Sequence, residues 1–155
     1  MGSPGLVPVC QVKAIPKMKV LLDPVVEHIK AVVERLFNCE AGSVSCKNDN
    51  EPHLVKYTGD QHRGVCMHTD SADVTLNVAL SDPGDFRGGG TYFEALDQVR
   101  WHVNLLLARI PLILVRQTVL LNQGEMLIHK GELKHKGVEI DSGVRIILVV
   151  SFYES

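Results

Sequence analysis

The feature that most constrains this chain is a set of potential metal ligands that lie far apart in the sequence. His68 and Asp70 are separated by one residue, whereas His135 follows far downstream and Arg145 comes ten residues after it. Two histidines and one carboxylate can hold an Fe(II) ion on one face and leave the opposite coordination positions open. Because side chains at i and i+2 of a strand point the same way, His68 and Asp70 are expected to reach one metal from a single strand.

The residues between these ligands follow a strand pattern. Apolar positions in residues 74–80 alternate with small or polar ones, which is typical of a strand with one buried face. Turn-forming residues follow at 81–85. The glycines at 88–90 permit a bulge before strand residues resume at 91, and they lack the lysine and the helix that a phosphate-binding loop requires.

Together these pieces resemble the catalytic domain of the 2-oxoglutarate and Fe(II)-dependent oxygenases, most closely the branch of prolyl 4-hydroxylases and procollagen lysyl hydroxylases. Each motif is weak alone, because a short pattern such as His-x-Asp arises by chance. Their succession in order is specific, and it covers roughly residues 52–98 and 118–153. The matching motifs are Tyr57-Thr-Gly59, His68-x-Asp70, Thr75-Leu-Asn-Val-Ala-Leu80, Phe86-x-Gly-Gly-Gly90-Thr-Tyr-Phe93, Gln123-Gly124, His135-x-Gly137 and Ser142-Gly-x-Arg145.

The resemblance implies that His68, Asp70 and His135 hold the iron and that Arg145 binds the far carboxylate of 2-oxoglutarate. A guanidinium presents two parallel donors to a carboxylate and stays charged, so Arg145 suits this task. Tyr57 corresponds to a position where many family members place a phenol near the co-substrate. A cofactor-binding role is also predicted for Thr91. Alternation puts Thr91 and Asn77 on a common face that either lines the cavity or faces solvent.

Arg145 also follows a predicted hairpin. Residues 141–143 are expected to form a tight turn, which would place Arg145 opposite Glu139. His135 would then lie four residues further along the partner strand, about 13 Å away at strand rise, and this gap suits a five-carbon diacid. The alternative is an ion pair between Arg145 and Glu139 across the hairpin.

His129 competes with His135 for the third ligand position. The interval from His135 to Arg145 and the glycine at position 137 favour His135. The remaining histidines, at positions 28, 53, 62 and 102, are interpreted as ordinary residues.

The implied reaction couples decarboxylation of 2-oxoglutarate to succinate and CO₂ with hydroxylation of a C–H bond. In this branch the usual substrate is a prolyl or lysyl side chain of a polypeptide, and L-ascorbate (vitamin C) restores the iron. The expected fold is mainly β, a double-stranded β-helix of the jelly-roll and cupin type with one or more N-terminal flanking helices. Two rival functions are a catalytically inactive relative that acts as a binding module and a cupin-like Zn²⁺ or Mn²⁺ enzyme that does not use 2-oxoglutarate.

Length and composition fit one domain over residues 1–155, with its core at about 52–153. The formal net charge of −2 gives no basis for a nucleic-acid surface, and the partner is expected to be a peptide or small-molecule substrate. The cysteines at 10, 39, 46 and 66 lack Cys-x-x-Cys spacing and are expected to be buried free thiols. No secretion signal is recognised, so the cytoplasm is the default compartment, with the endoplasmic reticulum as the alternative for a truncated chain.

A helix is expected to begin at Asp23 and Pro24, because aspartate caps helices and proline suits the first turn. Its predicted apolar stripe consists of Val25, Ile29, Val32, Val33 and Leu36. Residues 1–23 are expected to form an edge strand or an extended lead-in. This N-terminal side is short for a complete enzyme of the branch, which raises the chance that the sequence is a fragment.

Residues 99–117 depart from the family pattern. Removing them joins residues 93–98 smoothly to residues 118–124. Arg109 and Pro111 interrupt their apolar run, which is too short and broken to span a bilayer. We interpret the segment as a retained intron translated in frame or a lineage-specific insertion, with the first preferred because it suits neither a polar loop nor a capped helix.

Overall fold

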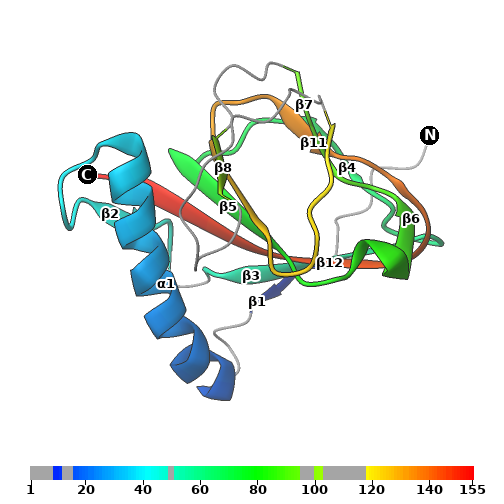
Figure 1. Cartoon of the computed structure of the whole chain (residues 1–155), viewed down its shortest axis with the longest axis horizontal. Coiled ribbons are helices and arrows are strands. Elements are labelled where there is room, and N and C mark those ends of the chain that lie inside the picture. Colours follow the sequence, from blue (N-terminus) through cyan, green and yellow to red (C-terminus); the bar gives the residue numbers. More distant parts are fainter. Residues whose placement is uncertain (1–8, 12–15, 49–50, 95–99, 103–117) are drawn as a thin grey trace.

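The computed structural model describes residues 9–11, 16–48, 51–94, 100–102 and 118–155. Within these residues, eight strands form a larger sheet and four strands form a smaller one, with antiparallel neighbours throughout. The two sheets face each other, and helix α1 (Pro16–Phe37) packs on the outside of the larger sheet (Figure 1). The expectation of a mainly β chain with an N-terminal flanking helix is confirmed.

The larger sheet is built around its longest strand. Its members are β1 (Val9–Gln11), β2 (Val44–Cys46), β3 (His53–Thr58), β5 (Val74–Ala79), β6 (Phe86–Gly88), β8 (Arg100–His102), β10 (Met126–Lys130) and β12 (Ile140–Glu154). The order is β1-β3-β12-β5-β10-β8, and β2 and β6 also pair with β12. The long strand β12 therefore runs through the middle of the sheet and fixes the register of its neighbours.

The smaller sheet carries two of the predicted ligands. Its strands are β4 (Val65–His68), β7 (Thr91–Phe93), β9 (Thr118–Val119) and β11 (His135–Gly137), in the order β4-β11-β7-β9. A short 3₁₀ turn, η2 (Pro83–Asp85), precedes β6. Pairing of β11 with β4 sets His135 directly opposite His68, although the two residues are far apart in sequence.

Alternation along the central strands separates an apolar face from a polar one. Leu76, Ile128 and Val150 are fully buried and pack against Ile29 and Val33 of α1. The intervening positions point between the sheets and carry buried polar side chains, namely Thr75, Asn77, His129, Arg145 and Ser151. The larger sheet therefore directs buried polar side chains into the space between the sheets and apolar side chains toward α1.

Helix α1 begins earlier than predicted. It starts at Pro16, and Pro24 lies inside it rather than in its first turn. Residues 17–22 contain good helix formers that extend the helix toward the N-terminus, while a proline removes a single backbone donor. Val26 is buried whereas Val25 is exposed, so the predicted stripe was wrong at that position.

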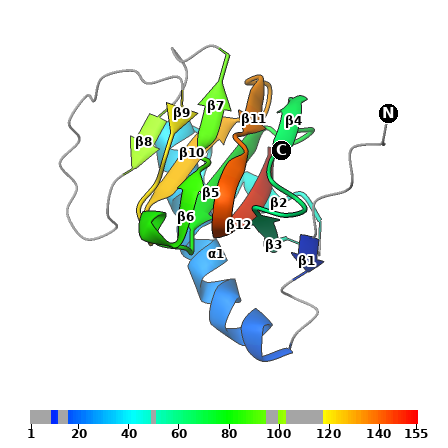
Figure 2. The ribbon, with the colours of Figure 1, turned by 90° about the vertical axis from the view of Figure 1, so that its right-hand side faces the viewer.

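The N-terminal part of α1 extends beyond the sheets, where Val20 and Leu21 are exposed (Figure 2). None of the described helices has both the length and the apolar character needed to cross a lipid bilayer.

The predicted hairpin at residues 141–143 was wrong. Strand β12 is continuous there, and Ser142 and Gly143 pair with β6 across a register shift. Gly143 has φ 84°, and a Cβ at this position would lie 2.1 Å from the carbonyl oxygen of Asp85. The turn-like residues therefore mark a bulge that lets β12 pass close to η2, rather than a reversal of the chain.

Part of the predicted insertion belongs to the sheet. Residues 100–102 form β8, which pairs with β10, while residues 99 and 103–117 lie outside the described residues. Free thiols are confirmed for Cys39 and Cys66, but neither is fully buried, and Cys66 is exposed on the edge strand β4. Cys46 is also only partly buried. The side chain of Cys10 lies outside the described part of the chain.

Candidate metal centre

His68, Asp70 and His135 converge at one end of the smaller sheet. Their potential ligand atoms all lie within 4.8 Å of one another. The Nε2 atom of His68 is 3.4 Å from Oδ1 of Asp70, and the Nε2 atom of His135 is 3.7 Å from Oδ2. Donor atoms bound to one first-row metal at about 2 Å lie roughly 3–4 Å apart, so this spacing fits a shared ion.

Main-chain carbonyls orient both imidazoles. The Nδ1 atom of His68 lies 2.8 Å from the carbonyl oxygen of Cys66, and the Nδ1 atom of His135 lies 2.8 Å from that of Leu133. A carbonyl can only accept, so each Nδ1 donates, and in the neutral form of each ring the lone pair lies on Nε2. Both Nε2 atoms face Asp70 in the form that binds metals. Two neutral imidazoles and a carboxylate are the donor set that suits Fe(II).

Asp70 reaches the cluster from a turn rather than from the strand. Strand β4 ends at His68, so the expectation that one strand carries both residues was wrong. The chain turns because the backbone N–H of Asp70 donates to the carbonyl of Gly131 at 2.9 Å. A Cβ on Gly131 would lie 1.8 Å from the carbonyl oxygen of Ala72, so glycine allows this close approach.

Arg145 lies buried between the sheets, next to Tyr57. The two residues are register partners on β12 and β3, and the guanidinium carbon lies 5.2 Å from the centre of the Tyr57 ring. The Nη1 atom of Arg145 donates to the carbonyl of Gly90 at 3.3 Å. The predicted position opposite Glu139, and the alternative ion pair with it, were wrong because β12 does not reverse; Glu139 instead lies 3.7 Å from Arg63.

Burial lowers the pKa of Arg145 and raises the pKa of Tyr57. Among the described residues, no carboxylate lies within ion-pair distance of the Arg145 guanidinium. Thr91 and Asn77 are 6% and 7% exposed, so the solvent-facing alternative for these two residues was wrong.

The chain is similar in sequence to known proteins, although no family model matches it. The 2-oxoglutarate and iron-dependent oxygenase domain-containing protein 2 of Danio rerio is 29% identical over 106 residues, which are 68% of this chain and 27% of that protein. Procollagen-lysine,2-oxoglutarate 5-dioxygenase 2 of Homo sapiens is 29% identical over 99 residues, which are 62% of this chain and 11% of that protein. The chain is a homologue of the 2-oxoglutarate and Fe(II)-dependent oxygenases.

Solved oxygenase structures share the fold. An oxidoreductase of the 2OG-Fe(II) oxygenase family from Burkholderia pseudomallei aligns with a TM-score of 0.59 at 13% identity, over 89% of this chain and 55% of that one. The non-heme alpha-ketoglutarate-dependent epimerase of nogalamycin biosynthesis aligns with a TM-score of 0.63 at 14% identity, over 99% of this chain and 64% of that one. The expected jelly-roll fold is confirmed. The oxygenase homologue spans only about a quarter of the zebrafish relative.

In this oxygenase homologue, Thr75 contacts the ligand set and was not predicted to do so. Its Oγ1 donates to Oδ2 of Asp70 at 2.6 Å. Burial raises the pKa of Asp70, but the hydrogen bonds from His68 and Thr75 and the charge of His135 together lower it to about 2. The hydrogen bond with Asp70 raises the pKa of His68, whereas burial lowers that of His135. Strand alternation could have placed Thr75 on the inward face, but it could not have given the hydrogen bond with Asp70.

His129 lies behind His135 rather than among the clustered ligands. It is fully buried, its Nδ1 donates to the carbonyl of Lys130 at 2.9 Å, and its Nε2 lies 3.4 Å from Nδ2 of Asn77. Its ring centre is 4.6 Å from that of His135 and 5.1 Å from that of Phe93. Burial, followed by the charge of His135, lowers the pKa of His129 to about 4. His129 therefore supports the His135 ring as a neutral packing partner.

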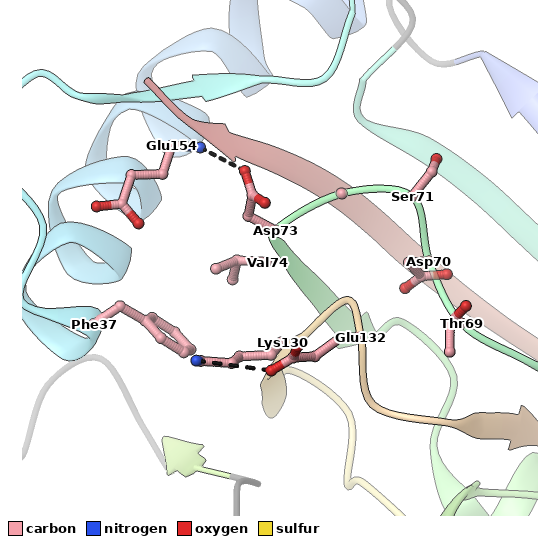
Figure 3. A pocket seen from close by; sticks show the side chains of 10 residues that line it. Phe37, Thr69, Asp70, Ser71, Asp73, Val74, Lys130, Glu132 and Glu154 are labelled. Atoms are coloured by element: carbon pink, nitrogen blue, oxygen red, sulfur yellow. Dashed lines mark hydrogen bonds and ion pairs between the residues drawn. The ribbon is translucent and has the colours of Figure 1, made fainter.

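A hollow of about 700 Å³ opens beside Asp70 in the oxygenase homologue (Figure 3). Its walls come from the turn after β4, the turn after β10, the end of α1 and the end of β12. Besides Asp70, the carboxylates of Asp73, Glu132 and Glu154 line it, against the single lining ammonium of Lys130, which lies 3.8 Å from Glu132. Carboxylates therefore outnumber ammonium groups in the lining of the hollow.

Proposed function

We propose that the chain is the catalytic domain of a 2-oxoglutarate- and O₂-dependent Fe(II) dioxygenase, in which His68, Asp70 and His135 hold the iron. The observation that carries this proposal is the convergence of two Nε2 lone pairs on one carboxylate. Bound Fe(II) supplies the oxidation chemistry that converts 2-oxoglutarate to succinate and CO₂ and hydroxylates a C–H bond. L-ascorbate is the proposed reductant that keeps the iron in this state.

Arg145 is the proposed anchor for the far carboxylate of 2-oxoglutarate. Its guanidinium is buried without a carboxylate among the described residues, and a dicarboxylate would supply the missing negative charge. The carbonyl of Gly90 and the ring of Tyr57 hold the guanidinium in place, which leaves further N–H donors for a carboxylate. Thr91 directly follows Gly90, is buried, and is proposed to line the co-substrate cavity.

The proposed substrate is a lysyl or prolyl side chain in a polypeptide, and the acidic hollow favours a lysine-containing peptide. A lysyl side chain could lay its aliphatic stem on Phe37 and Val74 and direct its ammonium toward Glu132 and Glu154 (Figure 3). Further support comes from the name of the human relative, which is a procollagen-lysine dioxygenase.

Succinate release tests the proposal. The purified chain is supplied with Fe(II), L-ascorbate, 2-oxoglutarate and either a lysyl or a prolyl peptide. Turnover is expected in wild type, and Asp70→Ala is expected to abolish it because that variant lacks one of three metal ligands. Arg145→Ala is expected to raise the KM for 2-oxoglutarate by roughly 10- to 100-fold, because losing a charge-assisted hydrogen bond usually weakens binding by this factor.

Asp60→Ala is the matched control, because Asp60 is an exposed carboxylate and its loss should leave turnover unchanged. A folded, iron-loaded wild type that forms no succinate with either peptide would favour the inactive binding module. Oxidation of either peptide in the absence of 2-oxoglutarate, followed by mass spectrometry, would favour the cupin-like alternative.

A further inference from the structure

Two groups outside the ligand set hold Asp70. Its backbone N–H donates to the carbonyl of Gly131 at 2.9 Å, which fixes the turn that carries it. Its Oδ2 accepts a hydrogen bond of 2.6 Å from Oγ1 of Thr75. Hydrogen bonds from a hydroxyl to an ionised carboxylate are typically this short and about twice as strong as neutral ones. Thr75 therefore restrains rotation of the carboxylate as well as its position.

The larger sheet holds Thr75 firmly. The residue lies on β5, is 3% exposed, and is the register partner of His129 on β10 and Ser151 on β12. As a β-branched residue it has a stiff χ1 angle, and its hydroxyl has a single hydrogen, which it gives to Asp70. The larger sheet therefore sets the orientation of the carboxylate, whereas both histidine ligands belong to the smaller sheet.

The two oxygens of Asp70 are not equivalent. Oδ2 accepts the Thr75 hydrogen bond, while Oδ1 does not and lies 3.4 Å from Nε2 of His68. Carboxylates bind metals through one oxygen or through both. An oxygen that already accepts a short hydrogen bond has less electron density for a metal, which favours binding through the other oxygen. Binding through one oxygen leaves an additional coordination position open for exogenous ligands.

Resting on the proposed function, we infer that Thr75 is a positioning residue that keeps Asp70 a single-oxygen metal ligand and so preserves an open coordination position for the co-substrate. The inference concerns the geometry of the ligand set, and metal binding alone can test it. Co(II) is a suitable probe because its visible absorption bands change with coordination number and geometry.

The test titrates the purified full chain with Co(II) in the absence of 2-oxoglutarate. Thr75→Val keeps the shape of the side chain and removes the hydroxyl. We expect it to bind Co(II) roughly 10- to 100-fold more weakly, which is the usual effect of losing a hydrogen-bond partner of a metal ligand. Its absorption bands should also shift. Thr75→Ser restores the donor and should restore both readouts. Ser151→Ala, which removes a buried hydroxyl from the neighbouring strand, should bind Co(II) as wild type does.

Wild-type affinity and unchanged bands in folded Thr75→Val would overturn the inference. If circular dichroism shows that Thr75→Val does not fold, Thr75→Ala provides the same comparison with Thr75→Ser. A wild type that shows the Thr75 dependence but makes no succinate would support the inference and contradict the proposed function. If the wild type makes succinate and Thr75→Val binds Co(II) as the wild type does, the result would support the proposed function and contradict the inference about Thr75.

Discussion

Arg145 brings a positive charge into the space between the two sheets. It is 5% exposed, and its partners among the described residues are the carbonyl of Gly90 and the ring of Tyr57, neither of which carries an opposing charge. Removing a charged group from water costs free energy that a single neutral hydrogen bond does not offset. The residue proposed to bind the co-substrate should therefore reduce the stability of the chain when no co-substrate is bound.

We accordingly expect Arg145→Met to raise the free energy of unfolding of the ligand-free chain by about 1 kcal/mol or more. The same variant should lose any increase in stability that 2-oxoglutarate gives to the metal-loaded wild type. Urea unfolding with and without 2-oxoglutarate measures both effects. Arg87→Met, at an exposed arginine of β6, is the control and should change stability by less than about 0.5 kcal/mol. A less stable Arg145→Met would assign the arginine a structural role instead.

Sequence reasoning at the scale of residues named the three residues whose potential ligand atoms cluster, but it missed the hydroxyl that holds Asp70. His68, Asp70 and His135 could be named because their motifs are local. The choice between His135 and His129 was harder, since both lie on inward faces, and the pairing of His135 with His68 separates them. The bond between Thr75 and Asp70 depends on how the intervening turn folds, which strand alternation cannot specify.

Among the connections between strands, the turn after β10 sets the position of Asp70. Gly131 accepts from the N–H of Asp70 and donates to the carbonyl of Asp73, each at 2.9 Å. Its Cα faces the carbonyl of Ala72 so closely that no side chain fits between them. Two turns that are distant in sequence are therefore packed backbone to backbone beside the ligands.

Gly131→Ala is expected to displace the turn that carries Asp70 and to lower the free energy of unfolding by about 1–3 kcal/mol, the usual effect of forcing extra volume into a packed site. Co(II) affinity should fall at the same time, because the carboxylate moves with its turn. Gly84→Ala is the control, since a Cβ there meets a side-chain oxygen at 3.2 Å and no backbone. If Gly131→Ala lost stability but kept full Co(II) affinity, the turn would not be what positions Asp70.

Helices and strands were predicted well where the alternation of side chains was regular. They were predicted poorly where a glycine or proline was compatible with two different backbone structures. The strand at residues 74–79 followed from its pattern, although both of its faces are buried and not one, as predicted. The bulge at Gly143 and a hairpin turn share the same composition, and only pairing with β6 distinguishes them. Pro24 likewise suits either the first turn of a helix or a tolerated interior position, so the start of α1 was placed too late.

Across the whole molecule, the candidate metal centre joins the two sheets. His68 and His135 belong to the smaller sheet, and Asp70 is hydrogen-bonded to Thr75 of the larger one. An ion bound by all three residues would add a connection that the unfolded chain lacks, so metal binding should stabilise the fold.

We expect Co(II) at 100 times its Kd to raise the free energy of unfolding by about 2.7 kcal/mol, and EDTA to reverse the gain. Thermal unfolding followed by circular dichroism measures this change. His135→Gln keeps a polar side chain of similar size but lacks the ligand geometry, so its unfolding should be nearly insensitive to Co(II). Equal stabilisation of wild type and His135→Gln would place the bound ion elsewhere in the molecule.

The segment between β8 and β9 leaves from the last strand of one sheet and re-enters at the last strand of the other. Neither strand carries a proposed ligand, and each has a pairing partner on one side only in the strand orders of the described sheets. Chain length can therefore vary at this junction over evolutionary time without breaking a single interior strand pair. An extra exon or a misread splice site would be tolerated better here than in the turn that carries Asp70.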